Sequence, residues 1–119
     1  MDKIQIIQKI EETGLVPVVR AASSDEAMRV IDAIKEGGVS VLEITMTVPG
    51  AVKVIEEVVA KYGSEATVGA GTVLDPETAR ACILAGAQFV VSPALNLETI
   101  ALCRRYSIPV MPGALTPTE

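Results

Sequence analysis

The chain has 119 residues, half of them hydrophobic and only 3% aromatic, with a formal net charge of −5. This length fits one domain, and the absence of a basic cluster argues against nucleic acid or an anionic membrane as a partner. There is no histidine, which excludes histidine-based triads and histidine-bound zinc. The first residues hold no long apolar run, so neither a signal peptide nor a membrane span is predicted, and we expect a cytoplasmic protein.

Helices and strands are predicted to alternate along the chain. Isoleucines at 4, 7 and 10 indicate an opening helix that stops near Gly14. The starts of four later helices are predicted by capping residues or by a proline suited to the first helical turn. These residues are Ser23 with Glu26, Pro49, Asp75-Pro76 and Asn96. Short apolar runs between them predict five strands: 15–20, 39–46, 66–72, 88–92 and 107–111. Pro17 counts against a central place for the first strand, because proline cannot donate to a ladder.

Apolar stripes suggest which helix faces are buried. The helix after Pro49 is expected to bury Val52, Ile55 and Val59, and the helix after Asn96 is expected to bury Leu97, Ile100 and Ala101. Cys82 and Cys103 fall in predicted helices, where we interpret each as a small buried hydrophobe and not as a metal ligand or disulfide partner.

Strict β-α alternation predicts a parallel sheet with right-handed crossovers. The repeat of roughly 20 to 26 residues fits an α/β fold of the (β/α)₈ TIM-barrel type, which usually needs about 250 residues. About four βα units and a fifth strand are present, so we interpret residues 1–119 as a single domain, the N-terminal half of such a barrel. Its first and fifth strands would be open edges, which we expect another half or another chain to cover.

Glu43 is the residue around which this interpretation is organised. It lies in the middle of a strand that is apolar on both sides, where an unpaired carboxylate is costly. One reading is a buried ion pair with Arg20, which ends the neighbouring strand, or a strand end that reaches solvent. The other reading is a working acid or base, because burial raises the pKa of a carboxyl group toward neutrality.

Further candidates follow from the barrel, since chemistry in such folds sits at the C-terminal ends of strands. These positions are Arg20, Glu43, Thr45, Thr47, Gly71, Thr72, Ser92, Pro93, Pro112 and Gly113. The run Gly69-Ala70-Gly71-Thr72 is not a nucleotide-binding loop, because Leu74 stands where a third glycine is required. It is predicted to be a close-packed turn, where Thr72 offers a hydroxyl and a backbone N–H to a carboxylate.

Five segments, each at a strand end, together resemble a known family: Val18-Val19-Arg20-Ala21, Leu42-Glu43-Ile44-Thr45, Gly69-Ala70-Gly71-Thr72-Val73, Val91-Ser92-Pro93 and Met111-Pro112-Gly113. The chain is similar over its whole length to the N-terminal part of 2-keto-3-deoxy-6-phosphogluconate (KDPG) aldolases and 4-hydroxy-2-oxoglutarate (KHG) aldolases. The resemblance implies a (β/α)₈ barrel, commonly a homotrimer, that cleaves a 2-keto-3-deoxy-6-phospho sugar acid to pyruvate and glyceraldehyde 3-phosphate. It implies no metal or organic cofactor.

By the same resemblance, a lysine forms a Schiff base with the keto carbon and a glutamate, here Glu43, transfers protons. Thr72 matches the threonine that holds the carboxylate of the substrate, while Arg20 and Pro93 match residues near the pocket. Many members carry an arginine at the position of Thr47, where it helps to bind the carboxylate of the substrate. Whether Thr47 makes this contact in its place is left undecided by the sequence.

The family's Schiff-base lysine belongs to the sixth strand, and the five lysines of this sequence, Lys3, Lys9, Lys35, Lys53 and Lys61, all fall in or beside predicted helices. We therefore expect these 119 residues alone to be inactive. Two alternatives stay open at this point. One is a non-catalytic half-barrel fragment or assembly module, and the other is a different phosphate-binding barrel enzyme.

Overall fold

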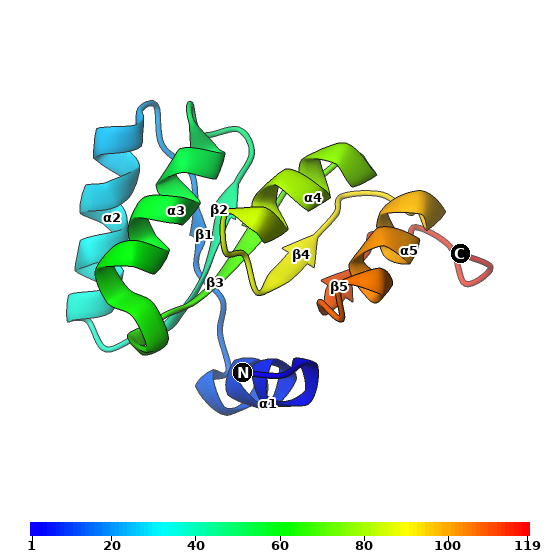
Figure 1. Ribbon diagram of the computed structural model, residues 1–119, viewed down its shortest axis with the longest axis horizontal. Helices are drawn as coiled ribbons and strands as arrows, with labels where there is room; N and C mark the ends of the chain where they lie inside the picture. Colours follow the sequence, from blue (N-terminus) through cyan, green and yellow to red (C-terminus); the bar gives the residue numbers. More distant parts are fainter.

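The computed structural model describes all residues, 1–119, as an α/β fold in which helices and strands alternate (Figure 1). The five α-helices are α1 (Lys3–Thr13), α2 (Ser24–Glu36), α3 (Ala51–Tyr62), α4 (Pro76–Leu84) and α5 (Leu97–Arg105). The five strands are β1 (Val18–Val19), β2 (Val41–Thr45), β3 (Thr67–Gly71), β4 (Phe89–Val91) and β5 (Val110–Met111), and a short 3₁₀ helix, η1 (Gly63–Glu65), precedes β3.

All strands are parallel and lie in the order β1-β2-β3-β4-β5. Each strand therefore pairs with the next strand in the sequence. In a doubly wound sheet the order would reverse at a switch point, whereas a barrel winds steadily in one direction. The predicted parallel β/α arrangement is confirmed, and the structure is a partial barrel of the TIM type.

Helices α2 to α5 cover one face of the sheet, and α1 lies apart from them at the end where the strands begin (Figure 1). The main core is built between the sheet and α2 to α5 from aliphatic residues, with Leu42, Ile44, Val68, Ala70 and Val90 from the strands. Both faces of β2 and β3 are buried along their whole length. This is the pattern expected of strands covered on both sides.

A smaller core lies on the other face of the sheet, against α1. It contains Ile6 of α1, Val41 at the start of β2 and Phe89 at the start of β4. The Phe89 ring is fully buried and lies over Gly69, where an added Cβ would be 2.1 Å from the ring carbon Cε2. A residue without a side chain on β3 is therefore what makes room for the only phenylalanine of the chain.

Three of the predicted helix starts have the expected caps. The side chains of Ser23, Asp75 and Asn96 accept hydrogen bonds from the backbone N–H three residues later, at 3.1, 2.7 and 2.8 Å. These bonds satisfy N–H groups that have no partner within the helix. Pro49 was predicted to lie in the first turn of the next helix, and this was wrong. Helix α3 begins at Ala51, after Gly50, which takes a left-handed conformation with φ of 69°.

Several predicted boundaries and faces were wrong in detail. The first strand is only two residues long, consistent with the missing N–H of Pro17 and a place at the sheet edge. Helix α3 buries Val54 and Val58 beside Ile55, while Val52 and Val59 are half-buried. Helix α5 buries Thr99, Leu102 and Cys103, whereas Leu97 is 72% exposed and Ala101 is also exposed. Both cysteines are buried and free, as predicted.

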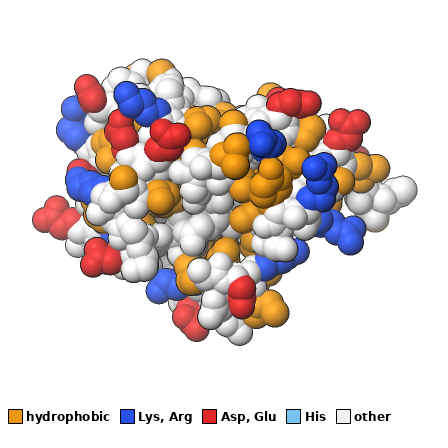
Figure 2. Space-filling view, in the orientation of Figure 1, with side chains coloured by type: hydrophobic (Ala, Val, Ile, Leu, Met, Phe, Trp, Pro, Cys, Tyr) orange, Lys and Arg blue, Asp and Glu red, His pale blue; other side chains and the backbone are white.

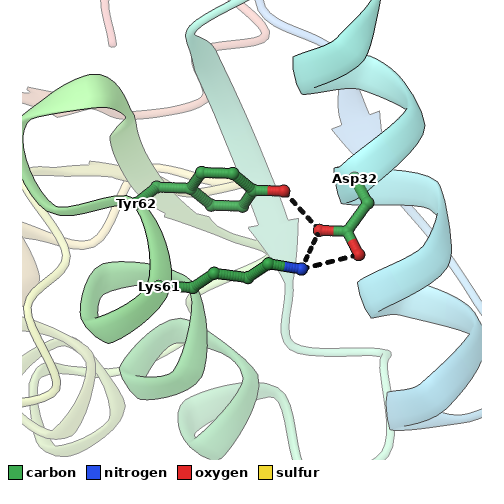
Figure 3. A network of polar contacts seen from close by, with 3 residues as sticks. All are labelled: Asp32, Lys61 and Tyr62. Carbon is green, nitrogen blue, oxygen red and sulfur yellow. Dashed lines mark hydrogen bonds and ion pairs between the residues drawn. The ribbon is translucent and has the colours of Figure 1, made fainter.

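The outer helices α2 and α3 are joined by a polar network (Figure 3). Lys61 forms an ion pair with Asp32 at 2.8 Å, and the Tyr62 hydroxyl donates to the same carboxylate. These bonds lower the pKa of Asp32 and raise that of Lys61. Acidic and basic side chains are interspersed over the helix-covered face (Figure 2). None of the helices has the length and apolar character needed to cross a membrane.

Candidate active site

Glu43 occupies the centre of β2 and is 8% exposed. By strand alternation its side chain shares the α1 side of the sheet with Val41. Its carboxyl group lies against Gly71 on β3, where an added Cβ would come within 1.7 Å of Oε1. Gly71 therefore provides the space for the Glu43 carboxyl. The sequence predicted a close-packed turn at this glycine but not which group packs against it.

Burial raises the pKa of Glu43, and the charge of Arg20 offsets part of this rise. No ion pair forms between the two side chains, since the structure contains only the pair of Lys61 and Asp32. Arg20 directly follows β1 and is exposed. The suggestion of a buried ion pair at Glu43 is therefore wrong, and the carboxyl group is free of a direct cationic partner.

Removing the charge of Glu43 is expected to stabilise the fold in a pH-dependent way. Because the folded-state pKa is raised above the ordinary value of 4.5, ionisation of Glu43 opposes folding. This penalty is absent below the ordinary value, grows as the pH rises toward the folded-state pKa, and is constant above it. Glu43→Gln should raise the free energy of unfolding at pH 7 and change it by almost nothing near pH 3.5.

Urea unfolding at the two pH values measures this difference. Glu57→Gln on the exposed side of α3 is the matched control, and its effect should stay within about 0.5 kcal/mol. A gain for Glu43→Gln of equal size at both pH values would show that ionisation is not the cause.

Two threonines follow Glu43 at the end of β2. Thr45 is fully buried and its hydroxyl donates to the Val19 carbonyl of β1 at 3.0 Å. The Thr47 hydroxyl is 2.7 Å from that of Thr45, and Thr47 itself is exposed. Thr47 is thereby held beside the strand end, although its backbone already belongs to the loop. Sequence reasoning named both residues but did not find this contact.

Thr72 directly follows Gly71 and has a φ of 56°. A positive φ is a genuine outlier for a β-branched residue and is unfavourable by roughly 1–2 kcal/mol. Such conformations persist only where the surroundings enforce them, and they concentrate at functional sites. Thr72 is half-buried and directly follows the glycine against which the Glu43 carboxyl lies.

Pro93 lies at the end of β4, two strands away from Glu43. It contacts the turn after β5, since a Cβ on Gly113 would be 2.3 Å from the Pro93 carbonyl oxygen. The neighbouring Ser92 is 5% exposed, and its hydroxyl has no hydrogen-bond partner. Pro93 thus belongs to the same end of the sheet as the other candidates and contacts the turn after β5.

The fold and this arrangement define a class of protein: a partial barrel of the (β/α) type with a buried carboxyl group that lies against the C-terminal end of β3. The comparison with known families agrees with that class. Residues 6–119 match the family described as KDPG and KHG aldolase. The chain belongs to this family.

Individual relatives are similar over nearly the whole chain. The chain is 39% identical to a KHG/KDPG aldolase of Escherichia coli over 94% of its residues, and 34% identical to a 2-dehydro-3-deoxy-phosphogluconate aldolase of Treponema pallidum over 98%. A KDPG aldolase structure from Legionella pneumophila, with pyruvate captured as a covalent carbinolamine intermediate, has a TM-score of 0.79 at 30% identity.

These matches cover only part of each relative. The chain covers 53% of the Escherichia coli protein and 55% of the Treponema protein. In the Legionella comparison, 87% of this chain is superimposed on 50% of the other. The chain therefore spans about half the length of the curated relatives it matches.

Proposed function

We propose that this chain forms the first half of a (β/α)₈ barrel that acts as a Schiff-base aldolase. The proposed reaction is the cleavage of a 2-keto-3-deoxy-6-phospho sugar acid to pyruvate and glyceraldehyde 3-phosphate. The observation that carries the proposal is the Glu43 carboxyl, which is buried against Gly71 at the end of β3, has no ion-pair partner and has a raised pKa. Such a group can exchange protons closer to neutral pH than an ordinary glutamate. The pyruvate carbinolamine of the Legionella relative supports the same chemistry.

In this proposal Glu43 is the general acid and base. Thr72 binds the carboxylate of the substrate through its hydroxyl and backbone N–H, which its unusual φ of 56° holds in a fixed direction. Arg20 contributes positive charge near the Glu43 carboxyl, as its effect on the pKa indicates. Pro93 shapes the far wall of the pocket with Gly113, and Thr47 is a further contact with the substrate.

The nucleophilic lysine is proposed to come from the second half of the barrel. The lysines described here lie on the helices, namely Lys3 and Lys9 on α1, Lys35 on α2, and Lys53 and Lys61 on α3. Lys61 is engaged by Asp32, and Lys35 donates to the Glu65 carbonyl. None of them extends from the C-terminal end of a strand, so none is placed to reach a keto carbon beside Glu43.

A trapping experiment tests whether the nucleophilic lysine comes from the second half of the barrel. Residues 1–119 alone, incubated with pyruvate and borohydride, should give no adduct and no aldol cleavage above background, because Schiff-base chemistry needs a positioned and partly neutral amine. Supplying the second half of the barrel, by fusion or in trans, should restore both. An adduct on one of the five helical lysines of the isolated chain would refute the proposal.

A specific observation supports a second candidate function, that of an assembly module. Strands β1 and β5 each pair on one side only, and Val18 and Met111 at these edges are 49% and 39% exposed. We propose that the second half of the barrel pairs with both edges and that complete barrels form homotrimers. The alternative is that copies of this half-barrel pair with one another and have no catalysis. Sedimentation of the 119-residue chain distinguishes a single copy from such self-assembly.

A further inference from the structure

A chain of hydrogen bonds at the end of β2 leads from the backbone of β1 to the surface. Thr45 is fully buried and donates its hydroxyl proton to the Val19 carbonyl at 3.0 Å. The Thr45 oxygen is also 2.7 Å from the hydroxyl oxygen of Thr47, which is exposed to solvent. The outer end of this chain is therefore accessible to a ligand, while its inner end is fixed in the sheet.

The chemistry of the partners sets the direction of both bonds. A hydroxyl group has one proton and two lone pairs, and a carbonyl oxygen has only lone pairs. Thr45 therefore uses its single proton on Val19 and can only accept in its contact with Thr47. Thr47 must supply the proton of that second bond. Its own proton is then engaged, and only lone pairs remain for a ligand.

An ionised carboxylate also has only lone pairs to offer. Placed against Thr47, it would leave two acceptors facing each other without a proton. A hydroxyl group of a ligand, in contrast, can donate to Thr47. We propose that Thr47 is a specificity-determining residue that accepts a hydrogen bond from a hydroxyl group of the substrate and does not bind its carboxylate, with Thr45 as the positioning residue. This inference rests on the proposed function.

The two threonines lie close enough to Glu43 for Thr47 to contact the same substrate molecule. Thr45 and Glu43 lie two residues apart on the same side of β2, a separation of about 7 Å along a strand. Thr45 pairs in register with Gly71, the residue against which the Glu43 carboxyl lies. A small molecule in contact with Glu43 is therefore large enough to contact Thr47 as well.

Two ligands separate the alternatives. A keto-deoxy sugar acid has both a carboxylate and hydroxyl groups, whereas pyruvate has a carboxylate and no hydroxyl group. In the complete barrel that contains these residues, Thr47→Val should lower kcat/KM for cleavage of the sugar acid about 3- to 10-fold, the usual effect of losing one neutral hydrogen bond. Borohydride trapping with pyruvate should change less than twofold. Thr47→Ser, which keeps the hydroxyl, should retain both activities.

The positioning role of Thr45 has its own readout. Thr45→Val removes the acceptor for the Thr47 proton, so it should raise KM for the sugar acid while the response to pyruvate is preserved, and Thr45→Ser should restore KM. Equal losses with both ligands in Thr47→Val would identify Thr47 as a carboxylate contact and overturn the inference. The absence of any loss would overturn it as well. A wild-type barrel that does not trap pyruvate would refute the proposed function itself, which distinguishes the two failures.

Discussion

Glu43→Gln is expected to lower the aldolase kcat of the complete barrel by a factor of about 10² to 10⁴, the usual contribution of a positioned general acid or base. Glutamine has nearly the same shape but cannot give and take a proton. The carboxyl group is 8% exposed and lies against Gly71, so water cannot readily replace it. Steady-state rates with the phosphorylated keto-deoxy sugar acid measure the loss.

The control for this prediction is Glu57→Gln on α3, which removes an exposed carboxylate outside the strand-end region and should leave kcat unchanged. Because Glu43→Gln is also expected to stabilise the fold at pH 7, unfolding cannot account for its loss of activity. An undiminished kcat in Glu43→Gln would remove this residue from the mechanism.

The largest effect on stability is expected at Phe89, the largest of the fully buried side chains. Phe89→Ala would leave a cavity between α1 and the sheet and should lower the free energy of unfolding by about 3–5 kcal/mol. Gly69→Ala acts on the same contact from the other side, because its methyl group would lie 2.1 Å from the ring. That overpacking should cost about 1–3 kcal/mol.

A double substitution tests whether the two residues share one space. Gly69→Ala with Phe89→Leu should be less destabilising than the sum of the single changes, because the smaller side chain leaves room for the methyl group; couplings of about 0.5–3 kcal/mol are typical of residues in contact. Urea unfolding of the wild type, Gly69→Ala, Phe89→Leu and the double variant measures this coupling. Leu97→Ala is the control on α5, where 72% exposure predicts a change within about 0.5 kcal/mol. Strict additivity of the two single changes would contradict the contact.

The sequence was sufficient to predict the parallel β/α order and the strand that carries Glu43. An apolar run with a single carboxylate is unusual, and the alternation around it assigns the residue to a buried strand. The ion-pair question could not be answered in the same way. Arg20 follows the end of β1 and Glu43 lies on the neighbouring β2, but whether the guanidinium turns toward the carboxyl or toward solvent depends on the side-chain conformation.

Helix α5 shows why the buried face was mispredicted. Leu97, Ile100 and Ala101 have helical spacing, but so do Thr99, Leu102 and Cys103, and the apolar stripe alone favoured the first set. The structure buries Thr99 because its hydroxyl is satisfied by the Asn96 side chain at 3.0 Å. A polar residue whose hydrogen bond is made locally can be buried at little cost, and hydropathy patterns do not reveal this.

The contacts at the strand ends depended on details that no sequence pattern contains. The link between Thr45 and Thr47 requires a particular side-chain conformation at both residues. The left-handed conformation of Thr72 runs against the preference of a β-branched residue, so local propensity predicts the opposite. Sequence reasoning therefore found the residues at the strand ends but not how they contact one another.

The most direct test of Glu43 as the proton-transfer group is exchange of the pyruvate methyl protons with solvent deuterium, followed by NMR in the complete barrel. This exchange requires only pyruvate, the nucleophilic lysine and the acid–base group, so it excludes effects on binding the rest of the sugar acid. The wild-type protein should exchange these protons, and Glu43→Gln should slow the exchange by at least about 10²-fold. Equal exchange rates in the two proteins would contradict the assignment of Glu43.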